Sequence, residues 1–101
     1  MAKFTIRWKD CDKSKSIQSY FEDKLSILAK YSFLNENIKA EIVYYSKTKT
    51  FKTRINVGIK KGKLLRAEAS SPQIKASINF ALDKIIDQLR RVKTKMLRNK
   101  K

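Results

Sequence analysis

The apolar residues of this chain change their spacing along the sequence, and that change limits the folds available to it. Four stretches alternate between apolar and polar residues, a pattern typical of half-buried strands. They are residues 3–8, 38–45, 51–59 and 65–69. Helical spacing appears instead from Ile17 to about Lys30 and from Pro72 to about Arg98. The chain therefore predicts the element order β-α-β-β-β-α.

Polar residues mark the ends of these elements. Ser14 or Ser16 is placed to cap the first helix, because a hydroxyl oxygen accepts from its unpaired N–H groups. Ser71 is placed to cap the second helix, and Pro72 suits a first helical turn. Residues 35–37, Asn-Glu-Asn, predict a turn before the second strand.

The predicted fold class is α+β with two layers. A four-stranded mixed sheet carries both helices on one face, so that the apolar strand faces and helical stripes bury each other. The first two strands are joined by a helical crossover and should be parallel, whereas the hairpins are antiparallel. We expect a single domain over 1–98 and a basic end over 99–101. The second helix is longer than such a sheet, so its last turns should project beyond it.

Composition excludes several functions and favours one partner class. Lys and Arg number 25 against 9 Asp and Glu, a net charge of +16 that calls for a polyanion, and nucleic acid fits better than a membrane surface. With no His and only Cys11, neither a zinc site nor the commonest general base is available. The two glycines form no phosphate loop. We expect no enzyme, cofactor, metal or small-molecule substrate.

Two further absences bear on location. The sequence has no apolar run that could span a bilayer and no secretory signal at its start. Cys11 cannot form an internal disulfide, which fits a reducing compartment. The expected location is the cytoplasm.

The second half of the last helix is the first candidate RNA-binding surface. After Asp87 the chain has no carboxylate side chain, and the helix dipole accounts for only two or three of the cations there. Phosphate contact is the favoured interpretation of the rest. The helical cations are Arg90, Arg91, Lys93, Lys95 and Arg98, followed by Lys100 and Lys101.

A second basic surface follows from strand parity, on the sheet face that the helices leave open. It is predicted to hold Lys3, Arg7, Lys39, Lys52, Arg54 and Arg66, with Tyr45 among them. Solubility and a second RNA contact both explain this face. Loops add Lys47, Lys49, Lys60, Lys61 and Lys63. Because Lys outnumbers Arg, phosphate contact is expected rather than base reading.

One family combines this length, charge and element order with a matching residue spacing. The matching positions are Leu65, Ala67, Ala69, Ala76, Ile78, Asp83, Lys84, Gln88, Leu89 and Lys93, with Lys24, Leu28 and Tyr31 in the first helix. The chain resembles the short ribosome hibernation-promoting factors and the related ribosome-associated inhibitors. It departs from them at Gln73 and Asn79, where the family often has Asp.

The resemblance implies a ribosome-associated protein. It would bind small-subunit ribosomal RNA, beside neighbouring ribosomal proteins, in the channel for messenger and transfer RNA, and block translation sterically during slow growth or stress. Lys24, Lys84 and Lys93 carry over as contacts by position. The other cations of the last helix carry over by type only. No dimerisation domain or inhibitor-type tail follows, so a monomer is expected when the protein is free.

Two alternatives remain open from the residues. A double-stranded-RNA-binding domain has an overlapping α-β-β-β-α order, although this chain adds a first strand. Its loop at 70–72 also lacks the Lys-rich helix start of that family. The other alternative is a constitutive ribosomal protein, which would be stoichiometric with ribosomes in growing cells.

Overall fold

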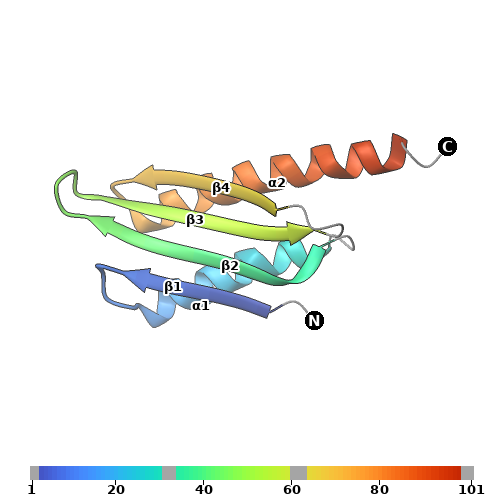
Figure 1. Ribbon diagram of the computed structural model, residues 1–101. Helices are drawn as coiled ribbons and strands as arrows, with labels where there is room; N and C mark the ends of the chain where they lie inside the picture. The colour runs from blue at the N-terminus through green and yellow to red at the C-terminus, as the bar shows by residue number, and fades with distance from the viewer. Residues whose placement is uncertain (1–2, 31–33, 60–63, 99–101) are drawn as a thin grey trace.

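The predicted order of elements is confirmed in the computed structural model, which describes residues 3–30, 34–59 and 64–98 (Figure 1). Side chains are described over 5–28, 38–58 and 64–92. The elements are β1 (Lys3–Lys9), α1 (Lys15–Leu25), the 3₁₀ helix η1 (Ser26–Lys30), β2 (Leu34–Tyr45), β3 (Thr50–Ile59), β4 (Leu64–Ser71) and α2 (Ile74–Arg98). The fold is the expected two-layer α+β arrangement.

The sheet is mixed, with strand order β1-β2-β3-β4. β1 pairs with β2 in parallel, and both later pairings are antiparallel. This pattern follows from the connections, because α1 and η1 carry the chain from the end of β1 back to the start of β2. Both helices lie on one face of the sheet, and the other face is left open (Figure 1).

The core lies between the sheet and the helices, where the two apolar periodicities meet. Its fully buried large side chains are Phe21, Leu25, Leu28, Ile38, Ile42, Ile55, Val57, Ile78, Ile85 and Leu89. Truncating one of these to Ala typically costs about 2–5 kcal/mol, so the scaffold depends on both helical stripes.

A polar pair is also buried in this core: strand alternation places Thr53 on the inward face, but the apolar stripe of the second helix gave no sign of Ser77. Thr53 on β3 and Ser77 on α2 are fully buried, with their hydroxyl oxygens 2.8 Å apart. The Ser77 hydroxyl donates to the carbonyl oxygen of Ile74 at 2.7 Å, so Thr53 is left to donate to Ser77. The pair satisfies itself, as buried polar groups must.

Three predicted boundaries are wrong. The first helix tightens into η1 at Ser26, whose hydroxyl donates to the Asp23 carbonyl at 2.6 Å and competes with the α-helical pattern. Residues 35–37 belong to β2, because ladder pairing to β1 and β3, across a register shift between Leu34 and Ile38, overrides their turn propensity.

The start of the second helix is the third wrong boundary. α2 begins at Ile74 rather than at Pro72, with Ser77 N–H donating to the Gln73 carbonyl at 3.1 Å. The Ser71 hydroxyl accepts from Gln73 N–H at 3.2 Å, before the helix begins. At the first helix the prediction is confirmed, because Ser14 accepts from Ile17 N–H.

The length of α2 has the expected consequence. Its 25 residues span about 37 Å, and its last turns run past the sheet (Figure 1). Leu89 is the last buried residue among the side chains that the structure describes. The second half of α2 therefore forms an arm beyond the core.

Candidate nucleic-acid interface

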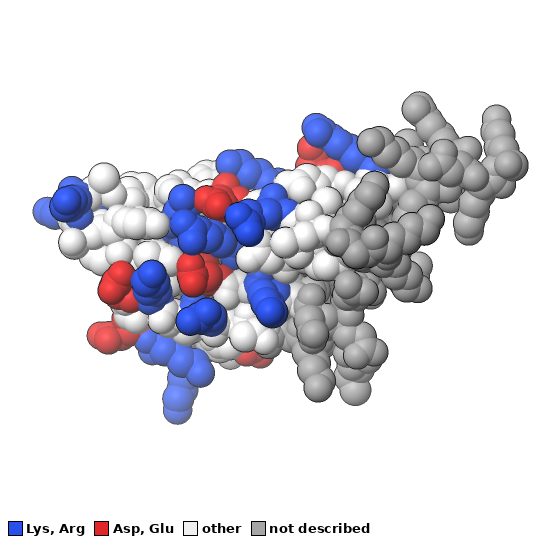
Figure 2. Space-filling view, viewed as in Figure 1, with Lys and Arg blue, Asp and Glu red and all other residues white. Residues whose placement is uncertain are grey.

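The open sheet face carries charges of both signs. Strand pairing places Arg7, Glu41, Arg54 and Glu68 in one row across β1 to β4, so positive and negative side chains alternate. Figure 2 shows acidic side chains set among the basic ones over this face. Strand parity had placed the described cations on this face correctly but had not singled out the two acids, although Glu41 shares the parity of Lys39 on β2 and Glu68 that of Arg66 on β4.

Ion pairs join these charges. Arg54 Nη1 lies 3.4 Å from Glu41 Oε1, and Arg54 Nε lies 3.7 Å from Glu68 Oε1. Lys52 Nζ lies 2.8 Å from Glu68 Oε2. The hydrogen bond from Lys52 is the main cause that lowers the pKa of Glu68, with the nearby Arg54 and Arg66 adding to it. Lys52 and Arg54 thus already have counter-charges within the protein.

Three more of the predicted cations lie around a shallow hollow on this face, whereas the side chain of Lys3 lies outside the described residues. Arg7, Lys39 and Arg66 line a volume of about 220 Å³ together with Glu41 and Arg54. Arg66 Nε donates to Asn56 Oδ1 at 3.0 Å. Tyr45 is 39% exposed but lines a separate hollow at the other end of β2, so it does not stack beside these cations.

On the helical side, Lys24 is held by an aromatic contact. Its Nζ lies 5.5 Å from the centre of the Tyr20 ring, and Lys75 Nζ lies 5.2 Å from the same ring. The Tyr20 hydroxyl donates to Asn79 Oδ1 on α2 at 2.8 Å, which links the two helices. Lys75 was not among the predicted cations, because its contact with Tyr20 joins two different helices and depends on how they pack.

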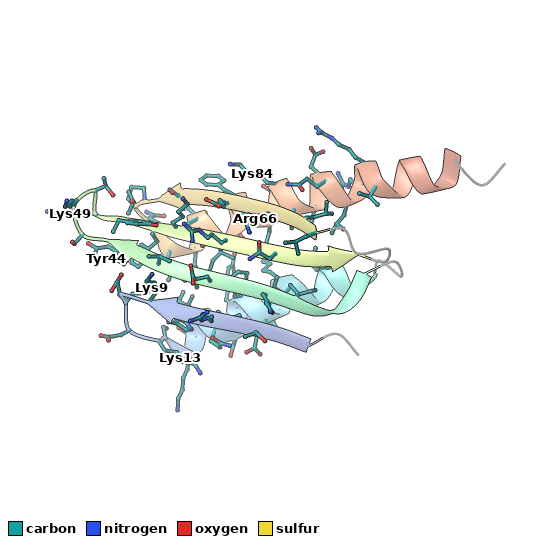
Figure 3. All side chains as sticks on the ribbon, viewed as in Figure 1. Lys9, Lys13, Tyr44, Lys49, Arg66 and Lys84 are labelled. Atoms are coloured by element: carbon teal, nitrogen blue, oxygen red, sulfur yellow. The ribbon has the colours of Figure 1, made fainter. Side chains whose placement is uncertain are left out.

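Lys84 has a structural partner of its own. Its Nζ donates to the Glu68 carbonyl at 2.9 Å, and Gln88 Nε2 donates to the Arg66 carbonyl at 2.8 Å. These carbonyls lie on β4, an edge strand of the sheet, and Figure 3 shows Lys84 where α2 meets β4. The side chains of Lys84 and Gln88 thus occupy backbone acceptors on this edge.

The arm of α2 carries the predicted helical cations, and the structure describes the side chains of only some of them. Arg90 and Arg91 are exposed, and Arg91 Nη2 lies 2.9 Å from Asp87 Oδ2. The side chains of Lys93, Lys95 and Arg98 lie outside the described residues, although the helix itself continues through them. Lys60 and Lys61 are outside the described residues altogether.

Three further features of the described residues bear on the chemistry. Within residues 3–30, 34–59 and 64–98, no three His, Cys, Asp or Glu side chains are grouped so as to hold a metal ion. The helices of the same ranges include none with the length and apolarity needed to cross a bilayer.

Burial raises the pKa of the Cys11 thiol, whose Sγ donates to the Ile42 carbonyl at 3.7 Å, so thiolate chemistry is disfavoured there.

Comparison with known proteins shows the family to which this chain belongs. The sequence profile described as "Sigma 54 modulation protein / S30EA ribosomal protein" matches residues 4–97. The chain belongs to this family. The resemblance drawn from residue spacing is therefore confirmed, and the family is not one of enzymes.

The chain is also similar to individual curated proteins and solved structures. The ribosome hibernation promotion factor of Lactococcus lactis subsp. cremoris (strain MG1363) is 33% identical over 97% of this chain and 53% of the relative. The chain thus spans about half the length of that relative.

Both solved structures share the fold of this family member. A ribosomal subunit interface protein from Coxiella burnetii superposes with a TM-score of 0.76 at 17% identity, over 90% of this chain and 97% of the other. The N-terminal domain of Thermus thermophilus Protein Y superposes with a TM-score of 0.72 at 25% identity, over 91% and 99%.

Proposed function

We propose that this chain binds small-subunit ribosomal RNA in the channel for messenger and transfer RNA and blocks translation by occupying it. Residues 1–98 act as one rRNA-binding domain in the cytoplasm, during slow growth or stress. Family membership and the similarity to a ribosome hibernation promotion factor support a role on the ribosome. The basic arm of α2 supports RNA as the contact.

That arm is the observation on which the proposal depends. It extends past the sheet, and no carboxylate side chain follows Asp87 to compete with RNA phosphates. Its cations are Arg90, Arg91, Lys93, Lys95 and Arg98. Lys24 and Lys75, gathered around Tyr20, extend the basic surface across the helical layer.

The mechanism is steric and electrostatic. The cations replace counterions condensed on rRNA, which gives affinity without base reading. The rigid two-layer scaffold then excludes messenger and transfer RNA from the space it fills. No covalent bond is made or broken, and no small molecule takes part. Neighbouring ribosomal proteins complete the binding site.

Cryo-EM of purified small subunits saturated with the chain tests this proposal. Density for the two-layer domain in the channel between head and body is the expected result, and density elsewhere would refute it. Cosedimentation gives a second measurement. With 6–10 phosphate contacts, affinity should fall roughly 10³–10⁵-fold between about 50 and 200 mM salt, by analogy with duplex DNA.

The two alternatives are separated by competition and abundance. The parallel pairing of β1 with β2 adds a strand to the α-β-β-β-α core of a double-stranded-RNA-binding module. Such a module would bind a free RNA duplex as tightly as it binds ribosomes. A constitutive ribosomal protein would remain stoichiometric in growing cells, whereas the proposed factor should be scarce there.

A further inference from the structure

A groove between the two helices contains a carboxylate, which does not suit phosphate binding. It has a volume of about 350 Å³ and is lined by Lys24 and Ile27 on one side and Asn79, Leu82, Asp83 and Ile86 on the other. Ile27 is 42% exposed, so part of the lining is apolar and open to solvent. This size falls at the small end of ligand pockets, and an apolar lining with a few polar groups is typical of them.

Asp83 is the unexpected member of this lining. Its carboxylate makes no ion pair or hydrogen bond with any residue that the structure describes, although the chain carries a net charge of +16. The other acid of α2, Asp87, is paired with Arg91. An unpaired carboxylate repels phosphate and accepts hydrogen bonds, so Asp83 suits a partner that presents N–H donors.

Asn79 supplies the complementary group one helical turn away. Its Oδ1 accepts from the Tyr20 hydroxyl at 2.8 Å, which fixes the amide and directs its two Nδ2 hydrogens away from that bond. Among the described residues, none accepts from Nδ2. Side chains at i and i+4 on a helix are neighbours, so an acceptor at Asp83 lies beside a donor at Asn79.

We propose that this groove holds the base of an unpaired guanine of the RNA, and this inference rests on the proposed function. The guanine N1–H and N2–H₂ donate to Asp83, and guanine O6 accepts from Asn79. The apolar lining covers a base face, and Lys24 provides a positive charge at the mouth. Recognition of splayed-out bases by their Watson–Crick edges is the usual route to specificity in RNA binding.

Two other occupants fit less well. A phosphate group would face the Asp83 carboxylate. A basic peptide from a neighbouring protein would meet Lys24 and Lys75 around Tyr20, on a chain that is already strongly cationic. Adenine would direct its N1 lone pair at Asp83 instead of an N–H group.

The first experiment separates a guanine contact from a net-charge effect, because the two predict opposite changes in RNA affinity when Asp83 loses its charge. Removing an acid from a cationic RNA-binding protein should raise its affinity if only net charge matters. We expect Asp83→Asn to weaken binding to the small subunit roughly tenfold, as for loss of a bidentate base contact. The matched control, Asp87→Asn, releases Arg91 and should leave affinity unchanged or raise it. Equal or tighter binding by Asp83→Asn would overturn the guanine site and leave the proposed function intact.

The second experiment needs no ribosome. In ¹⁵N NMR titrations of the whole chain with GMP, AMP or inorganic phosphate, GMP should shift the amides of Ile27, Asn79 and Asp83 most. Asp83→Asn should abolish the preference for GMP over AMP. Equal shifts with GMP and AMP, shifts with phosphate alone, or stronger shifts with an arginine-rich peptide would each refute the site. If native protein fails to bind the small subunit while GMP selectivity persists, the proposed function fails and the site stands.

Discussion

The open sheet face and the arm of α2 are both rich in cations, but they differ in where the counter-charges lie. On the sheet, Glu41 and Glu68 stand opposite Arg54, and Lys52 also contacts Glu68. On the arm, no acid follows Asp87. A phosphate that approaches the sheet must compete with several carboxylates already in place, whereas on the arm Asp87, paired with Arg91, is the last acid in the sequence.

The difference shows that the number of cations on a surface is a poor measure of its affinity for RNA. Exposed ion pairs contribute about 0–1 kcal/mol to folding, so the sheet pairs add little stability. Their larger effect is to lower the field that RNA meets on that side. Of the two explanations that the sequence left open for the sheet face, the ion pairs favour solubility.

Charge reversal on the arm should have the largest effect. Arg91→Glu with Lys93→Glu should weaken small-subunit binding by at least about 100-fold at moderate salt, because two contacts become repulsions. Lys52→Gln with Arg54→Gln should change affinity by less than about threefold. Cosedimentation at fixed salt measures both, and circular dichroism checks the fold. Equal losses from the two double variants would remove the distinction between the surfaces.

Lys84 has two competing roles that a substitution can separate. The family resemblance makes it an RNA contact, whereas in the structure its Nζ donates to the Glu68 carbonyl. Lys84→Met removes the hydrogen bond to Glu68 and should lower the free energy of unfolding by about 1 kcal/mol. Small-subunit affinity should fall less than about threefold. Urea unfolding and cosedimentation separate the effects, and a large loss of affinity with unchanged stability would restore the contact role.

Removing the sheet acids should make that face behave more like the arm. Glu41→Gln with Glu68→Gln raises the net charge of +16 by two and leaves Arg54 and Lys52 without their carboxylates. Affinity for a free RNA duplex should rise about threefold, with a steeper salt dependence. Filter binding measures both quantities. A lower affinity would mean that the ion pairs hold the face in a binding geometry.

The smallest expected effect is a pH dependence of stability. Because its folded-state pKa is lowered, Glu68 stabilises the native protein at neutral pH, and that contribution is lost as pH falls through the lowered value. With about a third of its side chain exposed, the contribution should stay below about 1 kcal/mol. Thermal unfolding of native protein and Glu68→Gln, from about pH 6 to pH 3, should show the shallower decline in the variant.

The fold was largely predictable because the spacing of apolar residues in each segment fitted either a strand or a helix, but not both. Alternation at Ile38, Ala40 and Ile42 and the stripe through Ile78 and Ile85 correctly identified the core faces. Local polar signals were less reliable: residues 35–37 favour a turn, but pairing with the neighbouring strands extends β2 through them. Propensity is a local quantity, and ladder formation is decided by the whole sheet.

The candidate interface was predictable in composition but not in pairing. Parity identified the cations of the sheet face, yet the distance from Lys52 to Glu68 depends on the register of β3 and β4, which no single strand specifies. The bonds from Lys84 and Gln88 to β4 likewise depend on how α2 crosses the sheet. The side-chain contacts of Lys93, Lys95 and Arg98 stay predictions.

The bonds from Lys84 and Gln88 to β4 also affect the behaviour of the protein in concentrated solution. An open sheet edge is a template on which another molecule can add a strand, and continued addition produces aggregates. Here the carbonyls of Arg66 and Glu68 are already occupied. Intermolecular growth through this border would first have to break both bonds, so the helix that carries the RNA-binding arm also protects the chain against self-assembly at β4.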